Sequence, residues 1–241
     1  MLKKLSLLTF LMLLVPLTTW AIGWKWTFGG AEYVLFGVDF WLFLLTETGS
    51  TPYALITCVL FMLWLMWLTR KRYSWLLVGF ICASSVVGTQ IIKEGAKAVF
   101  KEPRPFVTEM FQGNTEQFYA LSKLEQKQAV KTVAVSDNFA VAHQVDELGY
   151  SFPSGHTIFA VSWLLVFGGF LFGIATQGGY FAQLFAILWA GLMLISRLRL
   201  GMHYPIDLFV STLIAWAFHL LVFIRVVPYL ETWNLFKYRG K

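Results

Sequence analysis

Six apolar segments, each close to the length of a membrane-crossing helix, place the strongest limit on how this chain can fold. Spanning the hydrocarbon takes about 20 apolar residues in a helix, and inside hydrocarbon every backbone amide needs an internal partner. The weak ten-residue alternation of a membrane barrel is missing, and charged residues are 13% of the chain, against about 25% in soluble domains. The sequence therefore predicts an all-α, polytopic membrane protein. Its six-transmembrane-helix bundle forms one domain over residues 1–241, with spans near residues 5–24, 51–69, 73–92, 157–175, 180–196 and 206–227.

The first segment also resembles a secretory signal peptide. Lys3 and Lys4 precede an apolar run that ends in "TTWA", which is typical of a cleavage site after Ala21. A retained helix and a cleaved leader both leave Lys25 on the far side of the membrane. We expect a retained helix, and the topology is the same under either interpretation.

Lysine and arginine are distributed unevenly between the two sides of this topology. With a cytoplasmic N-terminus, the cytoplasmic segments hold nine basic residues against Glu231, and the other side holds ten basic and twelve acidic residues. Cytoplasmic loops carry the excess of positive charge in membrane proteins, so both termini are predicted to be cytoplasmic. The net charge of +6 then reflects topology, and we expect no nucleic-acid partner. The nine residues are Lys3, Lys4, Arg70, Lys71, Arg72, Arg225, Lys237, Arg239 and Lys241.

Two longer segments lie on the non-cytoplasmic side. Residues 25–50 are rich in aromatic side chains and predict an interfacial helix lying along the membrane. Residues 106–152 are the one substantial soluble stretch and predict a helical periplasmic subdomain. Within it Phe118, Leu121 and Leu124 recur at helical spacing, which predicts one helix packed over the membrane domain. A lid or entrance wall for substrate is the alternative role of this stretch.

Two further patterns concern packing inside the bundle. Gly169 and Gly173 form a small-xxx-small pair, which favours close helix packing. Cys58 and Cys82 both fall inside predicted spans, where we expect free thiols.

Polar residues gather in three short clusters at the ends of predicted spans, all on the non-cytoplasmic side. The first, "KAVFKEPRP", carries Lys97 and Arg104, the latter between two prolines. The second, "FPSGHT", places Ser154, Gly155 and His156 at the start of a span. A serine, a glycine and free backbone amides at a helix start favour anion binding.

The third cluster, "SRLRLGMHYPID", lies between two apolar segments. It contains Arg197, His203 and Asp207, and Pro205 is suited to open the helix that follows. Spacing of four can set the Asp207 carboxylate against one imidazole nitrogen of His203 and leave the other nitrogen free.

Charges at a membrane edge often have no catalytic role. Lysine and arginine near helix ends extend toward the headgroups, and this interpretation suits Lys93, Lys97, Lys101 and Arg199. Arg104 and Arg197 are harder to explain in that way, because one is fixed between prolines and the other lies deep in an apolar run.

Together the clusters hold two histidines, one aspartate and at least three cations. Metal sites need grouped carboxylates or Cys/His ligands, and the clusters hold two acids in separate segments, Glu102 and Asp207, so we expect no metal and no other cofactor. Fixed cations suit a group with several anionic oxygens. Phosphoryl transfer depends mainly on positioning and charge neutralisation, and histidine can act as nucleophile or as acid.

The three clusters resemble the signature motifs of the type 2 phosphatidic acid phosphatase superfamily, in the same order and with the same internal spacing. The six spans and long outer loop resemble its bacterial phosphatidylglycerophosphatase B branch. The resemblance implies an integral membrane, metal-independent lipid phosphatase of the bacterial inner membrane with its active site facing the periplasm. It implies phosphatidylglycerophosphate and undecaprenyl diphosphate as substrates, with phosphatidic acid and related lipid phosphates as further candidates.

The resemblance also implies a role for each motif residue. His203 would be the nucleophile, Asp207 would orient it, and His156 would protonate the leaving oxygen and then activate water. The phosphoryl oxygens would be bound by Lys97, Arg104, Ser154, Gly155 and Arg197.

Three alternatives remain open at this level. An anion transporter would use the cations as a pathway, yet no inverted repeat is visible in the sequence. An intramembrane serine hydrolase would use Ser154 with His156, although G-x-S-x-G is absent. Vanadate-binding haloperoxidases share the motifs but are soluble. The physiological lipid, the oligomeric state and the role of residues 106–152 are not specified by the sequence.

Overall fold

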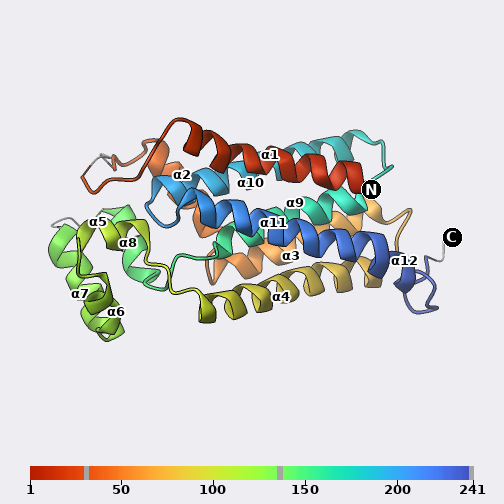
Figure 1. Cartoon of the computed structure of the whole chain (residues 1–241). Helices are drawn as coiled ribbons and strands as arrows, with labels where there is room; N and C mark the ends of the chain where they lie inside the picture. The colour runs from red at the N-terminus through yellow and green to blue at the C-terminus, as the bar shows by residue number, and fades with distance from the viewer. Residues whose placement is uncertain (30–32, 135–137, 239–241) are drawn as a thin grey trace.

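The computed structural model describes residues 1–29, 33–134 and 138–238, and these residues form helices and loops without a strand. Long helices lie side by side in a bundle, and short helices cover one of its ends (Figure 1). The bundle consists of α1 (Leu2–Ala21), α3 (Tyr53–Thr69), α4 (Trp75–Val99), α9 (Gly155–Phe170), α10 (Gln177–Arg199) and α11 (Pro205–Leu221), the last continued by η1 (Val222–Val226) and α12 (Val227–Leu230). The shorter helices are α2 (Val38–Glu47), α5 (Pro105–Met110), α6 (Thr115–Ala120), α7 (Lys123–Ala134) and α8 (Phe139–Asp146).

The all-helical membrane architecture is confirmed. Among the described residues, four helices are long and apolar enough to cross a bilayer: α1, α4, α10 and the continuous helix over Pro205–Leu230. The other two bundle helices, α3 and α9, are apolar but have 17 and 16 residues. A bundle with six membrane spans therefore stays a prediction.

Helix α9 lies at the centre of the bundle and is buried along almost its whole length. A Cβ added at Gly168 would lie 2.4 Å from Leu8 of α1, and one at Gly169 would lie 2.4 Å from the ring of Phe223. These two glycines let the neighbouring side chains reach the α9 backbone. The prediction that Gly169 and Gly173 form a packing pair on one helix was wrong, because Gly173 lies beyond the helix in a turn at φ +77°.

The first helix is part of this core. Leu5, Leu8 and Met12 are buried, and α1 packs against α9, α10 and α11. The two thiols are free, with Cys82 buried and Cys58 half-buried.

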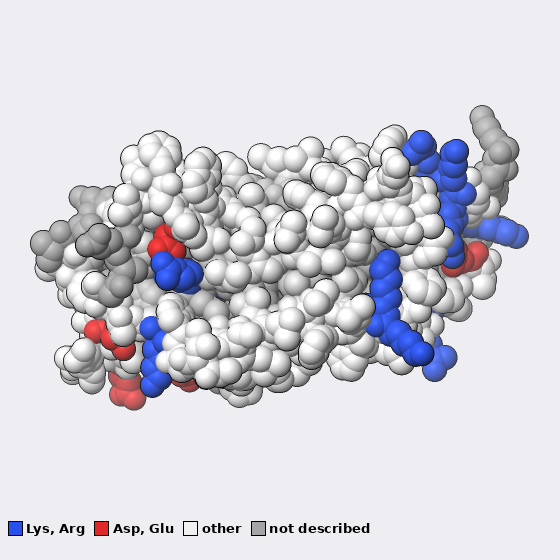
Figure 2. Space-filling view, turned by 90° about the horizontal axis from the view of Figure 1, so that it is seen from above, with Lys and Arg blue, Asp and Glu red and all other residues white. Residues whose placement is uncertain are grey.

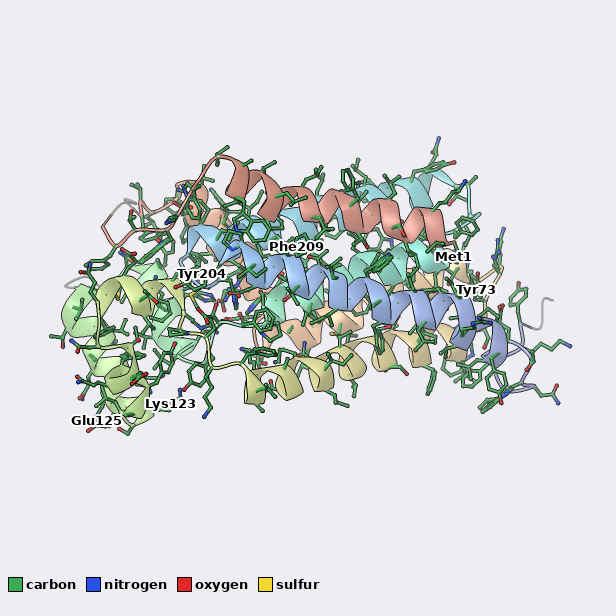
Figure 3. All side chains as sticks on the ribbon, viewed as in Figure 1. Met1, Tyr73, Lys123, Glu125, Tyr204 and Phe209 are labelled. Carbon is green, nitrogen blue, oxygen red and sulfur yellow. The ribbon has the colours of Figure 1, made fainter. Side chains whose placement is uncertain are left out.

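The two ends of the bundle differ in charge. The first residue and the last described residues lie at one end, and the short helices α5–α8 lie at the other (Figure 1). Figure 3 labels Met1 and Tyr73 at the first end and Tyr204 near the second. Lysine and arginine side chains surround the end with the termini, while most acidic side chains in view lie toward the opposite end (Figure 2). Arg239 and Lys241 fall outside the described residues.

The single helix predicted from the spacing of Phe118, Leu121 and Leu124 is broken in two. Leu121 has an extended backbone between α6 and α7, and Ser122 and Glu125 exchange hydrogen bonds with each other's amides at the start of α7. This S-x-x-E capping box begins a new helix. The prediction of one shared apolar face was therefore wrong: Phe118 is buried, whereas Leu121 and Leu124 are exposed.

The segment predicted to be interfacial contains α2, which packs against α10 and α8. The Asp39 carboxylate of α2 accepts two hydrogen bonds from Arg199 of α10, at 2.8 and 2.6 Å. Tyr33 donates to the Arg199 carbonyl and accepts from the Trp26 indole. Arg199 thus fixes α2 to the bundle instead of extending into the headgroups.

We expect Arg199→Ala to lower stability with little effect on turnover. The substitution leaves the buried Asp39 carboxylate without its partner, at a cost of about 1–3 kcal/mol. Thermal unfolding in detergent would measure the loss, and Arg199→Ala with Asp39→Ala should recover part of it. A large fall in kcat with unchanged stability would contradict this structural role.

Candidate active site

The three polar clusters meet in one cavity at the end of the bundle covered by α5–α8. Their elements are the last turn of α4 with the following loop, the start of α9, and the junction of α10 with α11. The cavity has a volume of about 880 Å³. Five of the predicted site residues line it: Lys97, Arg104, Gly155, His156 and His203.

His203 and Asp207 form a buried pair at the start of α11. Pro205 occupies the first turn, and the Tyr204 amide donates to Asp207 Oδ2 at 2.9 Å, closing a capping box. His203 Nδ1 lies 3.3 Å from the same oxygen, which also accepts from the Ser151 hydroxyl. Since a carboxylate only accepts, Nδ1–H is the donor and Nε2 keeps its lone pair.

The Nε2 of His203 accepts a hydrogen bond from Arg104 Nη1 at 3.4 Å. Burial lowers the pKa of His203 well below its usual value, and the nearby charges of Arg104 and Arg197 lower it further. The imidazole is therefore neutral near pH 7 and available as a nucleophile.

Arg104 is oriented by backbone carbonyls. It donates from Nε to the Gly149 carbonyl at 2.7 Å and from Nη1 to the Met202 carbonyl at 3.1 Å. Its Nη2 lies 3.3 Å from Glu147. Because these bonds use the planar fork of the guanidinium, lysine is a poor replacement.

Arg197 lies behind the cavity wall and is fully buried. It donates to Thr46 at 2.9 Å and to Glu147 Oε2 at 2.7 Å, and its Nη1 lies 2.8 Å from His143 Nε2. Burial alone would raise the pKa of Glu147, but Arg197, His156 and Arg104 hold it well below its usual value. Glu147 is thus an ionised carboxylate between the two arginines.

The second cluster begins α9. The Ser154 hydroxyl accepts from the Thr157 amide, and the Ser154 amide donates to Ser211 at 2.8 Å. Ser154 is therefore a helix cap behind the cavity wall, while Gly155 contributes to the wall itself. His156 Nε2 lies 3.0 Å from Ser50 and 3.5 Å from Glu147 Oε1.

Several polar residues of the site lie outside the three motifs. Glu147 is the most central, since it contacts both arginines and both neighbouring histidines. The available signal in the sequence was a histidine and a glutamate four residues apart, His143 and Glu147, shortly before the second cluster. The other residues missed from the sequence are Thr46, Glu47, Ser50, His143 and Ser151.

The cavity continues between bundle helices as an apolar slot. Its lining there comes from α3, α4 and α9. Part of this wall is formed by Ala54, Leu55, Cys58, Val86 and Phe159. Across the described ranges, no group of three or more His, Cys, Asp or Glu side chains is placed to hold a metal ion.

The family comparison matches the region that carries this geometry. The PAP2 superfamily model matches residues 74–230, from the start of α4 to the end of α12. Phosphatidylglycerophosphatase B of Haemophilus influenzae is 45% identical over 233 residues, covering 92% of this chain and 95% of that protein. Phosphatidylglycerophosphatase B of Escherichia coli K12 is 34% identical over 215 residues, covering 86% and 82%. The chain therefore belongs to the PAP2 superfamily and is a phosphate ester hydrolase.

Proposed function

We propose that this protein is an integral membrane lipid phosphatase that releases orthophosphate through a covalent phosphohistidine, without a metal ion. Phosphatidylglycerophosphate and undecaprenyl diphosphate are the proposed substrates. The proposal is supported by the names of the relatives and by an apolar slot that joins the polar cavity. A lipid phosphate needs both surfaces, because its headgroup is anionic and its chains are apolar.

In the first half-reaction the Nε2 lone pair of His203 attacks phosphorus. The bond between phosphorus and the leaving oxygen breaks, and His156 donates a proton to that oxygen. Arg104 and Lys97 neutralise the non-bridging oxygens, with Arg197 behind them, and the Gly155 amide adds a donor at the start of α9. Asp207 holds the Nδ1 proton and stabilises the positive charge that develops on the ring.

In the second half-reaction His156 accepts a proton from water, and the water oxygen attacks phosphorus. The phosphorus–nitrogen bond breaks, its electron pair returns to Nε2, and orthophosphate leaves. His156 ends protonated, ready for the next leaving group, so that protons balance over the cycle.

We propose that the site opens toward the periplasm. We propose six membrane spans in the bacterial inner membrane, with both termini cytoplasmic. The basic side chains at the terminal end support this orientation, and α5–α8 would then be a periplasmic subdomain. Substrate would enter sideways from the outer leaflet through the slot between α3, α4 and α9.

One observation carries the proposal: the neutral His203 is held by Asp207 on one side and faces Arg104 in the cavity on the other. The test is phosphate release by the purified protein from phosphatidylglycerophosphate, undecaprenyl diphosphate and phosphatidic acid, with a metal chelator present. Release that vanadate inhibits is the expected result. Failure to hydrolyse any of the three lipids would refute the proposal.

The alternative hydrolase has little support at this site. The Ser154 hydroxyl is buried and caps α9, and His156 Nε2 contacts Ser50 instead. A fluorophosphonate probe should therefore leave Ser154 unlabelled. The transporter alternative predicts vectorial anion flux and no phosphate release.

We expect Glu147→Gln to strengthen the binding of orthophosphate and vanadate. The carboxylate now neutralises Arg104 and Arg197 at 3.3 and 2.7 Å, so an entering phosphate has to compete with it. Loss of that charge should lower the inhibition constant of vanadate by about threefold to tenfold.

The matched control is Glu47→Gln, which removes a carboxylate that contacts His143 instead of the arginines. It should change vanadate inhibition much less than Glu147→Gln. Weaker inhibition of Glu147→Gln than of the parent would show that Glu147 supports anion binding and does not compete with it.

A further inference from the structure

The cavity contains more positive charge than the three motifs account for. Three lysines outside the motifs also line it: Lys93 from α4, and Lys123 and Lys127 from α7. Two of them have carboxylate partners: Lys93 with Glu94 at 2.7 Å, and Lys127 with Asp146 at 3.3 Å.

Lys123 is different, because its ammonium group has uncharged partners. It donates to Gln126 at 3.1 Å and to the Leu148 carbonyl at 3.3 Å. Among the described residues, no carboxylate lies within ion-pair distance of Lys123. Leu148 directly follows Glu147, whose carboxylate lies between the two arginines. The hydrogen bond to the Leu148 carbonyl therefore places the Lys123 ammonium group next to this part of the chain. Figure 3 labels Lys123 on the part of α7 that faces the bundle.

Lys93 extends the positive charge from the membrane side. A Cβ added to Gly155 would lie 2.9 Å from Lys93 Cδ and 3.7 Å from its Nζ. The Lys93 side chain therefore lies against the start of α9, one helical turn before Lys97. Lys123 and Arg104 line the same cavity. Burial lowers the pKa of Lys123, and the nearby charge of Arg104 lowers it further.

We propose that Lys123 anchors a second anion subsite at the mouth of the cavity, which binds a second phosphorus group of the substrate. The inference rests on the proposed function: Lys97, Arg104 and Arg197 hold the phosphoryl group that is transferred, and the second subsite holds the anionic group next to it. That group is the phosphodiester of phosphatidylglycerophosphate or the inner phosphate of a lipid diphosphate. Phosphatidic acid has one phosphorus and leaves the subsite to water.

The anchor of the subsite, Lys123, belongs to the helices that cover the membrane bundle. The role of residues 106–152 would then be selection among lipid phosphates.

The test compares specificity ratios in the full-length protein in detergent micelles. kcat/KM is measured for phosphatidylglycerophosphate, diacylglycerol diphosphate and phosphatidic acid with identical acyl chains. In Lys123→Ala, the ratio of each two-phosphorus substrate to phosphatidic acid should fall about threefold to tenfold, mainly through KM, because a charged hydrogen bond is lost. Lys123→Arg should keep the ratio, and Lys131→Ala, an exposed charge on the same helix away from the cavity, should not change it.

The substrates separate the two sources of the second anion. A fall for the diester substrate alone, or for the diphosphate alone, supports the subsite and fixes its distance from the transferred phosphoryl group. Unchanged ratios for both, or an equal loss on all three lipids, would overturn it. Absence of hydrolysis in the parent protein would instead refute the proposed function.

Discussion

His203→Ala should abolish lipid phosphate hydrolysis, with kcat at least about 10⁴-fold below that of the parent. General acid–base assistance alone contributes about 10²–10⁴-fold, and the loss of a covalent nucleophile removes the reaction path itself. His203 is 3% exposed, so alanine opens a small space beside Arg104 without exposing a new surface. The measurement is phosphate release under single-turnover conditions.

The covalent step has its own readout. Parent enzyme quenched in alkali during turnover of ³²P-labelled lipid should carry label on histidine, and His203→Ala should carry none. Arg199→Ala serves as the control, because its side chain pairs with Asp39 away from the cavity. Equal turnover by His203→Ala and the parent would rule out the proposed mechanism.

His156→Gln should lower kcat by about 10²–10⁴-fold on phosphatidic acid. The leaving group there is an alkoxide, which needs a proton as the bond to phosphorus breaks. The His156 ring lies at the cavity wall, with Nε2 at 3.0 Å from Ser50 and 3.5 Å from Glu147. Glutamine keeps the approximate size and one hydrogen bond but cannot transfer the proton.

The leaving group supplies the discriminating measurement. In a lipid diphosphate the departing group is itself a phosphate, with a pKa near 6, and needs little protonation. His156→Gln should therefore lose less in the first half-reaction on diphosphates than on phosphatidic acid. Identical losses on both substrate classes would argue that His156 acts only in activating water.

Features that depend on local sequence pattern were predicted well. The length of the apolar segments predicted the bundle helices, because a segment of about 20 apolar residues in lipid must satisfy its own backbone hydrogen bonds and does so as a helix. Cap chemistry gave the starts of two functional helices, with Ser154 before α9 and Pro205 at the start of α11. The spacing of four residues predicted the contact between His203 and Asp207, because that contact depends on a single turn of the chain.

The sequence did not predict what depends on contacts between distant segments. Glu147, Thr46 and Ser50 reach the site because α2 packs against α10 and α8 packs against α2, and no local period encodes that packing. Arg199 had a local explanation at the membrane edge, yet Asp39, 160 residues away along the chain, is its partner. The break at Leu121 was readable from Ser122 and Glu125 but was masked by the apolar spacing.

The central position of α9 makes remote damage hard to distinguish from chemical damage. Gly168 lies about 18 Å along the helix axis from His156, at a rise of 1.5 Å per residue. A side chain at Gly168 would meet Leu8, and the rigid rod between the two positions would pass the shift to the imidazole. Loss-of-function screens will therefore score residues near the end of the bundle that carries the termini as if they bound phosphate. Measuring both anion affinity and turnover in such variants will distinguish displacement of the general acid, His156, from its loss.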